Sequence, residues 1–183
     1  MTYGQQTEAY ARAVRRLLIA LAALFLGACA SPEPSGEHIA IASDFEGFRA
    51  WPSIELPRES LTAMHASGTR RLYVMGAPFV RDEPLPVGTM LVKAVEEGAP
   101  ETWEIHAMVK RGGDYNAAGA RGWEFFDLAL DASGNVAVRW RGEGPPPGFG
   151  YPGEGVGDGL CNGCHGLFPE RDFVLDRALL DAL

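Results

Sequence analysis

The chain has 183 residues, 46% of them hydrophobic, and a formal net charge of −8 at pH 7. This length predicts one domain once an N-terminal signal is set aside. A chain this acidic repels polyanions, which argues against nucleic acid or an anionic lipid surface as a partner. The charge favours a basic partner, or it only confers solubility.

The first 28 residues have the pattern of an export signal. Three arginines precede an apolar run, Leu17–Leu26, which is too short to cross a bilayer as a mature helix and is followed by small residues. The sequence Leu26-Gly-Ala-Cys29 resembles a bacterial lipobox, in which cleavage before Cys29 leaves a lipidated N-terminal cysteine. The alternative is an ordinary signal peptide cleaved nearby, which leaves Cys29 as a spare thiol. In both cases we expect an exported protein of the periplasm or cell envelope; lipid at Cys29 would anchor it to a membrane.

The mature chain that this signal predicts begins at Cys29. It has 155 residues and a net charge of −10, because the signal contains three of the 16 basic and one of the 24 acidic residues. Residues 29–43, rich in small residues and proline, predict a tether, and residues 44–183 predict the folded domain. The pattern allows helices around 45–51 and 58–66, separated by prolines.

The centre of the chain is rich in strand patterns. Residues 102–109 alternate, with Ile105 and Ala107 on one face and Glu104 and His106 on the other. Asp131-Ala-Ser-Gly134 lies between two apolar runs and is a hairpin signal. We expect about five antiparallel strands, over residues 71–75, 89–95, 102–109, 123–130 and 136–140. The predicted fold class is therefore α+β: mainly an antiparallel β-sheet with a few helices, among them a helical pattern in 171–183.

Cys161-Asn-Gly-Cys164-His165, near the C-terminus, carries most of the chemical information. Cys-x-x-Cys-His is typical of haem c attachment: two thiols add to the haem vinyl groups and the histidine binds the iron. Cysteines three positions apart present both sulfurs to one edge of the porphyrin. A zinc site would need four ligands, and no second Cys pair completes one. A thioredoxin-like motif follows a strand, whereas a loop rich in glycine and proline, 142–159, precedes this one.

The place of the motif bears on the sixth coordination position of the iron. The commonest small electron-transfer cytochromes carry the motif early and a methionine ligand downstream, but all five methionines here precede Cys161. A methionine from a strand could still reach the iron. The simpler expectation is that His165 is the only protein ligand and that the sixth position is open or holds water, which favours small-ligand binding or chemistry. Four-helix cytochromes c-prime also carry a late motif, but the strand pattern argues against a bundle.

From Arg70 to the end, the chain resembles the cytochrome P-460 family and its relatives called cytochrome c-prime-beta. The segments that carry the resemblance are Arg70-Arg-Leu-Tyr-Val, Gly88-Thr-Met-Leu-Val-Lys93, Met108-Val-Lys-Arg111, Gly122-Trp-Glu-Phe-Phe126, Cys161-Asn-Gly-Cys-His165 and Asp172-Phe-Val, with Trp51-Pro52 in the family's early helix region. The resemblance implies a mainly antiparallel sheet with a few helices, usually a homodimer, and one haem per subunit.

Lys93 is the first residue to which the resemblance assigns a chemical role. In cytochrome P-460 the lysine of this segment is bonded to a haem meso carbon, and the enzyme oxidises hydroxylamine; the c-prime-beta relatives keep the lysine without the crosslink. From the residues alone, Lys93 shares a strand face with Leu91 and Val95, which is unusual company for a solvated charge. Burial would lower its pKa and make the neutral amine available as a nucleophile. The alternative is a strand-end lysine whose amine reaches water.

The resemblance also bears on residues around the distal side of the haem. Arg70 matches an arginine near the distal pocket of the hydroxylamine oxidisers; the alternative is a surface arginine at a strand end. Leu85 stands where pocket phenylalanines are expected. Glu154 and Asp158 precede Cys161, where an oxidiser carries a proton-relay carboxylate; both are alternatively solvated loop charges. The remaining candidates are interpreted as structural histidines or as core and haem-packing aromatics: His65, His106, Trp103, Trp123, Phe125, Phe126 and Trp140.

Two functions from different classes follow. One is an enzyme that oxidises hydroxylamine at a haem c iron, with Lys93, Arg70 and Glu154 as catalytic residues, and passes electrons to a partner cytochrome. The other is a binding protein whose five-coordinate haem captures nitric oxide or another diatomic gas. Plain electron transfer is a third hypothesis, weakened by the missing downstream methionine.

Overall fold

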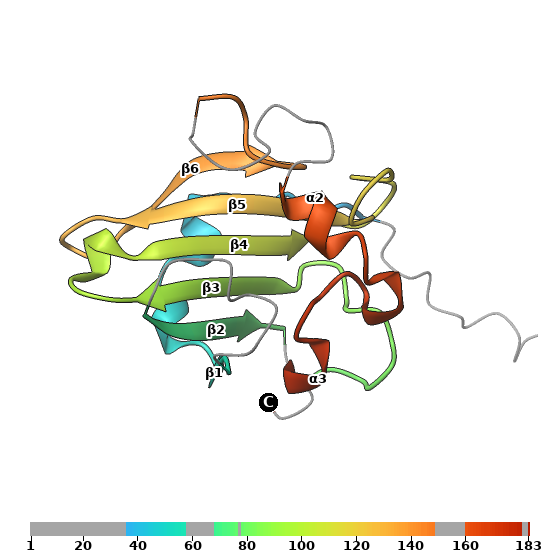
Figure 1. Cartoon of the computed structure of the whole chain (residues 1–183), viewed down its shortest axis with the longest axis horizontal. Coiled ribbons are helices and arrows are strands. Elements are labelled where there is room, and N and C mark those ends of the chain that lie inside the picture. Colours follow the sequence, from blue (N-terminus) through green and yellow to red (C-terminus); the bar gives the residue numbers. More distant parts are fainter. Residues whose placement is uncertain (1–35, 58–67, 77, 149–159, 181–182) are drawn as a thin grey trace, which may run out of the picture. The chain divides into compact units, whose positions relative to one another are not determined.

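The computed structural model describes residues 36–57, 68–76, 78–148, 160–180 and 183 (Figure 1). Within them, one six-stranded antiparallel sheet runs in the order β1-β2-β3-β4-β5-β6, so that each strand pairs with the next along the chain. The strands are β1 (Ser53–Glu55), β2 (Thr69–Met75), β3 (Met90–Glu96), β4 (Glu104–Lys110), β5 (Trp123–Leu130) and β6 (Val136–Gly142). The short helices are η1 (Ala42–Phe45), η2 (Phe48–Ala50), η4 (Pro100–Thr102), α2 (Leu160–His165), η5 (Pro169–Arg171) and α3 (Arg177–Leu180).

This architecture confirms the predicted α+β class, and all five predicted strands are present. β4 begins later than predicted, because Pro100 opens the turn η4 and the Thr102 hydroxyl donates to the Ala99 carbonyl, 2.7 Å away. β1 was not predicted: three residues are too few to show alternation, and the strand is defined by its pairing with β2. None of the helices in the described ranges is long and apolar enough to cross a membrane.

The predicted helices are realised only in part. The pattern around 45–51 forms two 3-10 helices, η1 and η2, separated by Gly47, whose φ of 70° lies in the left-handed region. The pattern around 58–66 lies outside the described residues. In the C-terminal stretch, Asp172 and Phe173 also have positive φ, 52° and 64°, and α-helix is confined to α3 among the residues of this stretch that the structure describes.

Alternation along the strands gives the sheet two apolar faces. The face covered by η1 and η2, called the η face here, buries Phe45 and Phe48 against strand residues such as Tyr73 and Phe126. The ring centroids of Phe45 and Phe126 are 5.2 Å apart, a tilted contact of the kind that stabilises by roughly 0.5–1.5 kcal/mol beyond the area it buries. Figure 1 shows η1 and η2 on one side of the sheet and α2 and α3 on the other.

The opposite face, called the α2 face here, packs against the C-terminal segment. Its buried members are Leu56, Leu72, Val74, Leu85, Leu91, Met108, Ala120, Trp123, Phe125, Trp140, Val174 and Leu180, with Cys161 and Phe173 partly buried against them. The predicted division of β4 between the two faces is confirmed, since Ile105 and Ala107 belong to the η face. Each of the Leu, Val, Met and Phe side chains stabilises the fold by about 1.5–3 kcal/mol when fully buried.

Two further features are the turn between β5 and β6 and the start of the compact unit. The predicted hairpin between β5 and β6 is confirmed: Asp131 Oδ1 accepts the backbone N–H groups of Ser133 and Asn135 at 2.8 and 2.9 Å, and Gly134 supplies a φ of 86°. The compact unit begins at Gly36, within residues that the sequence assigns to the tether. There the His38 N–H donates to the Arg111 carbonyl at 2.9 Å.

Candidate functional site

Helix α2 presents the two cysteines of the motif toward the α2 face. Cys161 and Cys164 lie one helical turn apart, and both are half-buried free thiols. Burial raises the pKa of the Cys161 thiol to about 11 and also raises the pKa of Cys164, while the Lys93 charge opposes both shifts. A redox-active Cys-x-x-Cys motif typically contains a thiol of lowered pKa, so these environments argue against the thioredoxin-like alternative.

A buried pair of amides fixes α2 against the loop between β4 and β5. Asn116 Nδ2 donates to Asn162 Oδ1, and Asn162 Nδ2 donates to Asn116 Oδ1, both at 2.8 Å. The Ala120 N–H also donates to Asn162 Oδ1 at 3.0 Å. Gly119 lets the two segments meet, since a Cβ there would lie 2.2 Å from the Asn162 side chain. Asn162, the first of the two residues between the cysteines, therefore docks the helix.

His165, at the end of α2, has its imidazole ring oriented by two contacts. Its Nδ1 lies 2.7 Å from the Phe173 carbonyl oxygen, and its ring packs against Phe125 with centroids 5.2 Å apart. A carbonyl acceptor makes Nδ1 the protonated nitrogen, so that Nε2 is the nitrogen that would bind iron. Two thiols on one helix face and an oriented imidazole in the next position fit the requirements of haem c.

Lys93 lies on the same face of the sheet, in the middle of β3. Its cross-strand neighbours are Leu72 on β2 and His106 on β4. Burial lowers the pKa of Lys93 to about 8; Arg70 acts in the same direction, whereas Glu104, Cys161 and Asp176 oppose the shift. Lys93 is thus partly buried, in line with its apolar strand neighbours. Its charge also lies close enough to Cys161 and Cys164 to affect the pKa of both thiols.

Arg70 lies on β2, two residues before Leu72, which is the cross-strand neighbour of Lys93. It pairs with Val95 and is half-buried. Its Nε is buried and has no hydrogen-bond partner within the described residues. A buried donor without a partner carries a free-energy cost, so this group is available to a polar ligand.

Asp176 is a half-buried carboxylate near Lys93 that the sequence analysis missed. Burial raises its pKa, whereas the charges of Lys93 and Arg171 oppose that shift. No sequence signal separates it from the other acidic residues, because it follows the haem motif and belongs to no recognised pattern. The only signal for Asn162 is its place inside the motif, and Asn116 has none.

The other predicted residues are distributed as follows. Leu85 is buried in the α2 face cluster. His106 lies on β4 with Nδ1 3.4 Å from Glu104 Oε1. Trp123, Phe125 and Trp140 belong to the α2 face cluster, while Trp103 packs against the η face, to which Phe126 belongs. The candidates Cys29, His65, Glu154 and Asp158 lie outside the described residues.

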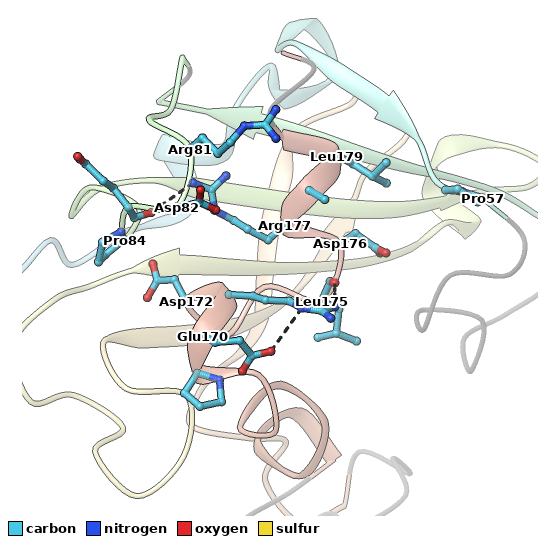
Figure 2. Close-up of a pocket in the computed structure, with 14 residues that line it drawn as sticks. Pro57, Arg81, Asp82, Pro84, Glu170, Asp172, Leu175, Asp176, Arg177 and Leu179 are labelled. Atoms are coloured by element: carbon cyan, nitrogen blue, oxygen red, sulfur yellow. Dashed lines mark hydrogen bonds and ion pairs between the residues drawn. The ribbon is translucent and has the colours of Figure 1, made fainter.

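A separate pocket of about 710 Å³ lies beside the C-terminal segment (Figure 2). It is bounded by the loop 81–84 and by residues 169–172 and 175–179. Three of its charged side chains have partners in the protein: Arg177 donates to the Val80 carbonyl at 3.0 Å, and Arg171 Nε lies 3.4 Å from Glu170 Oε1. Asp172 and Asp176 line it, but Cys161, Cys164 and His165 do not, so it is not the space in front of the motif.

Comparisons of the chain with protein-family models, with curated proteins and with solved structures found no match. Within the described part of the chain, no three His, Cys, Asp or Glu side chains gather as a metal-binding group. The resemblance to cytochrome P-460 therefore stays a prediction carried by the residues themselves.

Proposed function

We propose that this chain is an exported mono-haem cytochrome of the cytochrome P-460 and c-prime-beta type, which acts on or binds small nitrogen species. One arrangement carries the proposal: two thiols one turn apart on α2, followed by a histidine whose Nδ1 lies 2.7 Å from a backbone carbonyl. Cys161 and Cys164 would hold the haem covalently, and His165 Nε2 would bind its iron. When bound, the haem iron supplies a coordination position and one-electron redox chemistry for a small ligand.

Oxidation of hydroxylamine is the activity that we favour. Hydroxylamine loses protons as it loses electrons, so an oxidising site needs proton acceptors near the bound ligand. Lys93, with its pKa lowered to about 8, and Asp176, with its pKa raised by burial, are two such groups on the α2 side of the sheet. Arg70 Nε would donate a hydrogen bond to the ligand oxygen. The electrons would pass to a partner cytochrome, for which the acidic mature chain predicts a basic docking surface.

Capture of nitric oxide is the second candidate, and a different observation favours it. Val74, Leu91, Met108 and Phe125 are successive cross-strand neighbours and form an apolar row beside Lys93. An apolar wall suits a diatomic ligand and offers no group that takes up protons. In both cases we propose a haem with His165 as its only protein ligand, a homodimer, and lipid anchoring of the exported protein through Cys29.

Two measurements test the proposal in turn. Covalent haem that survives acid-acetone extraction should be present in the wild type and absent from the Cys161→Ala/Cys164→Ala variant; haem retained in that variant would refute the attachment. Purified protein with an electron acceptor should then consume hydroxylamine in a sustained manner. Asp176→Asn or Lys93→Ala should lower that rate by about 100-fold, as expected for loss of a general base, whereas the exposed control Asp114→Asn should not. Tight NO binding without turnover would instead establish the binding protein.

A further inference from the structure

Phe173, whose carbonyl oxygen accepts the hydrogen bond from His165, and its neighbour Asp172 have unusual backbone dihedral angles. Asp172 and Phe173 have φ values of 52° and 64°, in the left-handed region. This region is sparsely populated by residues other than glycine, and a bulky aromatic residue is especially uncommon there. Such a conformation persists only where the surroundings hold it. The Phe173 carbonyl oxygen lies 2.7 Å from His165 Nδ1. Its direction therefore depends on a backbone conformation that other contacts must stabilise.

Asp172 provides that support through three contacts with distant parts of the fold. Its Oδ1 pairs with the Lys110 ammonium at the end of β4, and its Oδ2 accepts the Leu85 N–H at 2.8 Å. Its backbone carbonyl accepts the Trp123 Nε1–H at 2.8 Å. The side chains of Asp172 and Lys110 are only 11% and 12% exposed, so water competes weakly for the ion pair.

Lys110 and Trp123, two of the partners of Asp172, also contact each other. Lys110 Nζ lies 5.0 Å from the centroid of the Trp123 ring, which closes a cluster of Lys110, Trp123 and Asp172. The Phe173 N–H in turn donates to the Phe168 carbonyl at 2.9 Å, which ties the strained pair to the turn that follows α2. Three of the segments that carry the resemblance to cytochrome P-460 meet here.

We propose that Asp172 is a positioning residue: together with Lys110 and Trp123 it fixes the Phe173 carbonyl against His165 and so sets how strongly the imidazole donates electrons to the iron. The inference rests on the proposed ligation of haem by His165. A firm acceptor on Nδ1 raises the basicity of Nε2, which strengthens the iron–histidine bond and favours the ferric state. A loosened acceptor does the reverse.

The test compares two variants of the haem-loaded protein with a matched control. Asp172→Asn keeps the shape of the side chain but removes the charge that pairs with Lys110, and Lys110→Met removes the opposite partner. Glu170→Gln makes the same charge change two residues away, at an exposed position where Glu170 lies 3.4 Å from Arg171. Readouts are the iron–histidine stretching frequency of the ferrous protein by resonance Raman spectroscopy and the reduction potential, with the far-UV spectrum as a check of folding.

We expect both cluster variants to lower the iron–histidine frequency and to shift the ferric–ferrous equilibrium about tenfold toward the ferrous state. A tenfold shift corresponds to about 59 mV for one electron. The double variant should shift it no further, because both changes act through one carbonyl. An unchanged frequency and potential in folded, haem-loaded Asp172→Asn or Lys110→Met would overturn the inference, as would an equal shift in Glu170→Gln. Absence of covalent haem from the wild type would instead refute the proposed function.

Discussion

Asn116 and Asn162 form two reciprocal hydrogen bonds through their side-chain amides, each 2.8 Å long, although 46 residues separate them in sequence. Both side chains are buried. A buried amide must have partners, and this pair satisfies two donors and two acceptors at once. The pair thus links the loop after β4 to the helix that carries both cysteines and His165.

Asn116→Ala and Asn162→Ala should each lower the free energy of unfolding by about 1–3 kcal/mol, because each leaves a buried amide without its partner. The double variant should cost less than the sum of the two single variants, since neither side-chain amide of the pair is then left without its partner. Urea denaturation measures all three, with the exposed Asn135→Ala as a reference. Strictly additive losses would mean that the two amides do not depend on each other.

Gly119→Ala tests the close approach beside this pair. A Cβ at position 119 would lie 2.2 Å from the Asn162 side chain, a distance that requires α2 or the loop to shift. We expect a loss of about 1–3 kcal/mol in stability, as for overpacking of a buried site, and a smaller fraction of protein with covalent haem. Gly36→Ala is the control, because open space surrounds that position. Equal stability and haem content in the two variants would refute the tight packing of α2.

The elements that the sequence predicts well are those whose signal is local. Alternation separates Ile105 from His106 and thereby assigns the faces of β4. The spacing of Cys161 and Cys164 is also local, although the helix α2 that places them one turn apart was not predicted. The Asp131 turn is equally local, because its hydrogen bonds reach no further than four residues.

The features that sequence reasoning misses depend on residues far apart in the chain. The ion pair between Lys110 and Asp172 spans 62 residues, and nothing near either residue indicates its partner. The positive φ of Phe173 contradicts local preference, since aromatic residues disfavour that region and the surrounding contacts enforce it. Asp176 is similar, because only folding brings this carboxylate near Lys93.

The lipobox pattern makes a separate prediction about the N-terminus. In a bacterium with lipoprotein processing, the mature chain should begin at Cys29 and carry lipid, and Cys29→Ser should abolish the modification while leaving covalent haem at Cys161 and Cys164. Intact-mass spectrometry of detergent-extracted protein measures both. A mature chain that starts at another residue would contradict this prediction.

Lys93 allows a test of the electrostatics of the site, because the chain contains only two lysines, Lys93 and Lys110. Reductive methylation with ¹³C-formaldehyde then gives two lysine signals, and Lys93→Arg identifies which one is lost. In the haem-free Cys161→Ser/Cys164→Ser variant we expect the Lys93 signal to titrate near pH 8, since burial lowers its pKa from 10.5 to about 8. Titration at the ordinary value would show that the amine reaches water.

The lowered pKa of Lys93 also predicts how stability depends on pH. Between about pH 8 and 10.5 the unfolded chain binds a proton at Lys93 that the folded chain has released. The unfolded state therefore binds more protons, and the free energy of unfolding rises with pH across this window. Below pH 8 both states are protonated, and the folded state bears the full cost of the buried charge. Lys93→Met should remove this rise and increase stability most at neutral pH, measured by urea denaturation at pH 7 and pH 10. If the difference in stability between the wild type and Lys93→Met is the same at pH 7 and pH 10, the amine is not buried as a charge.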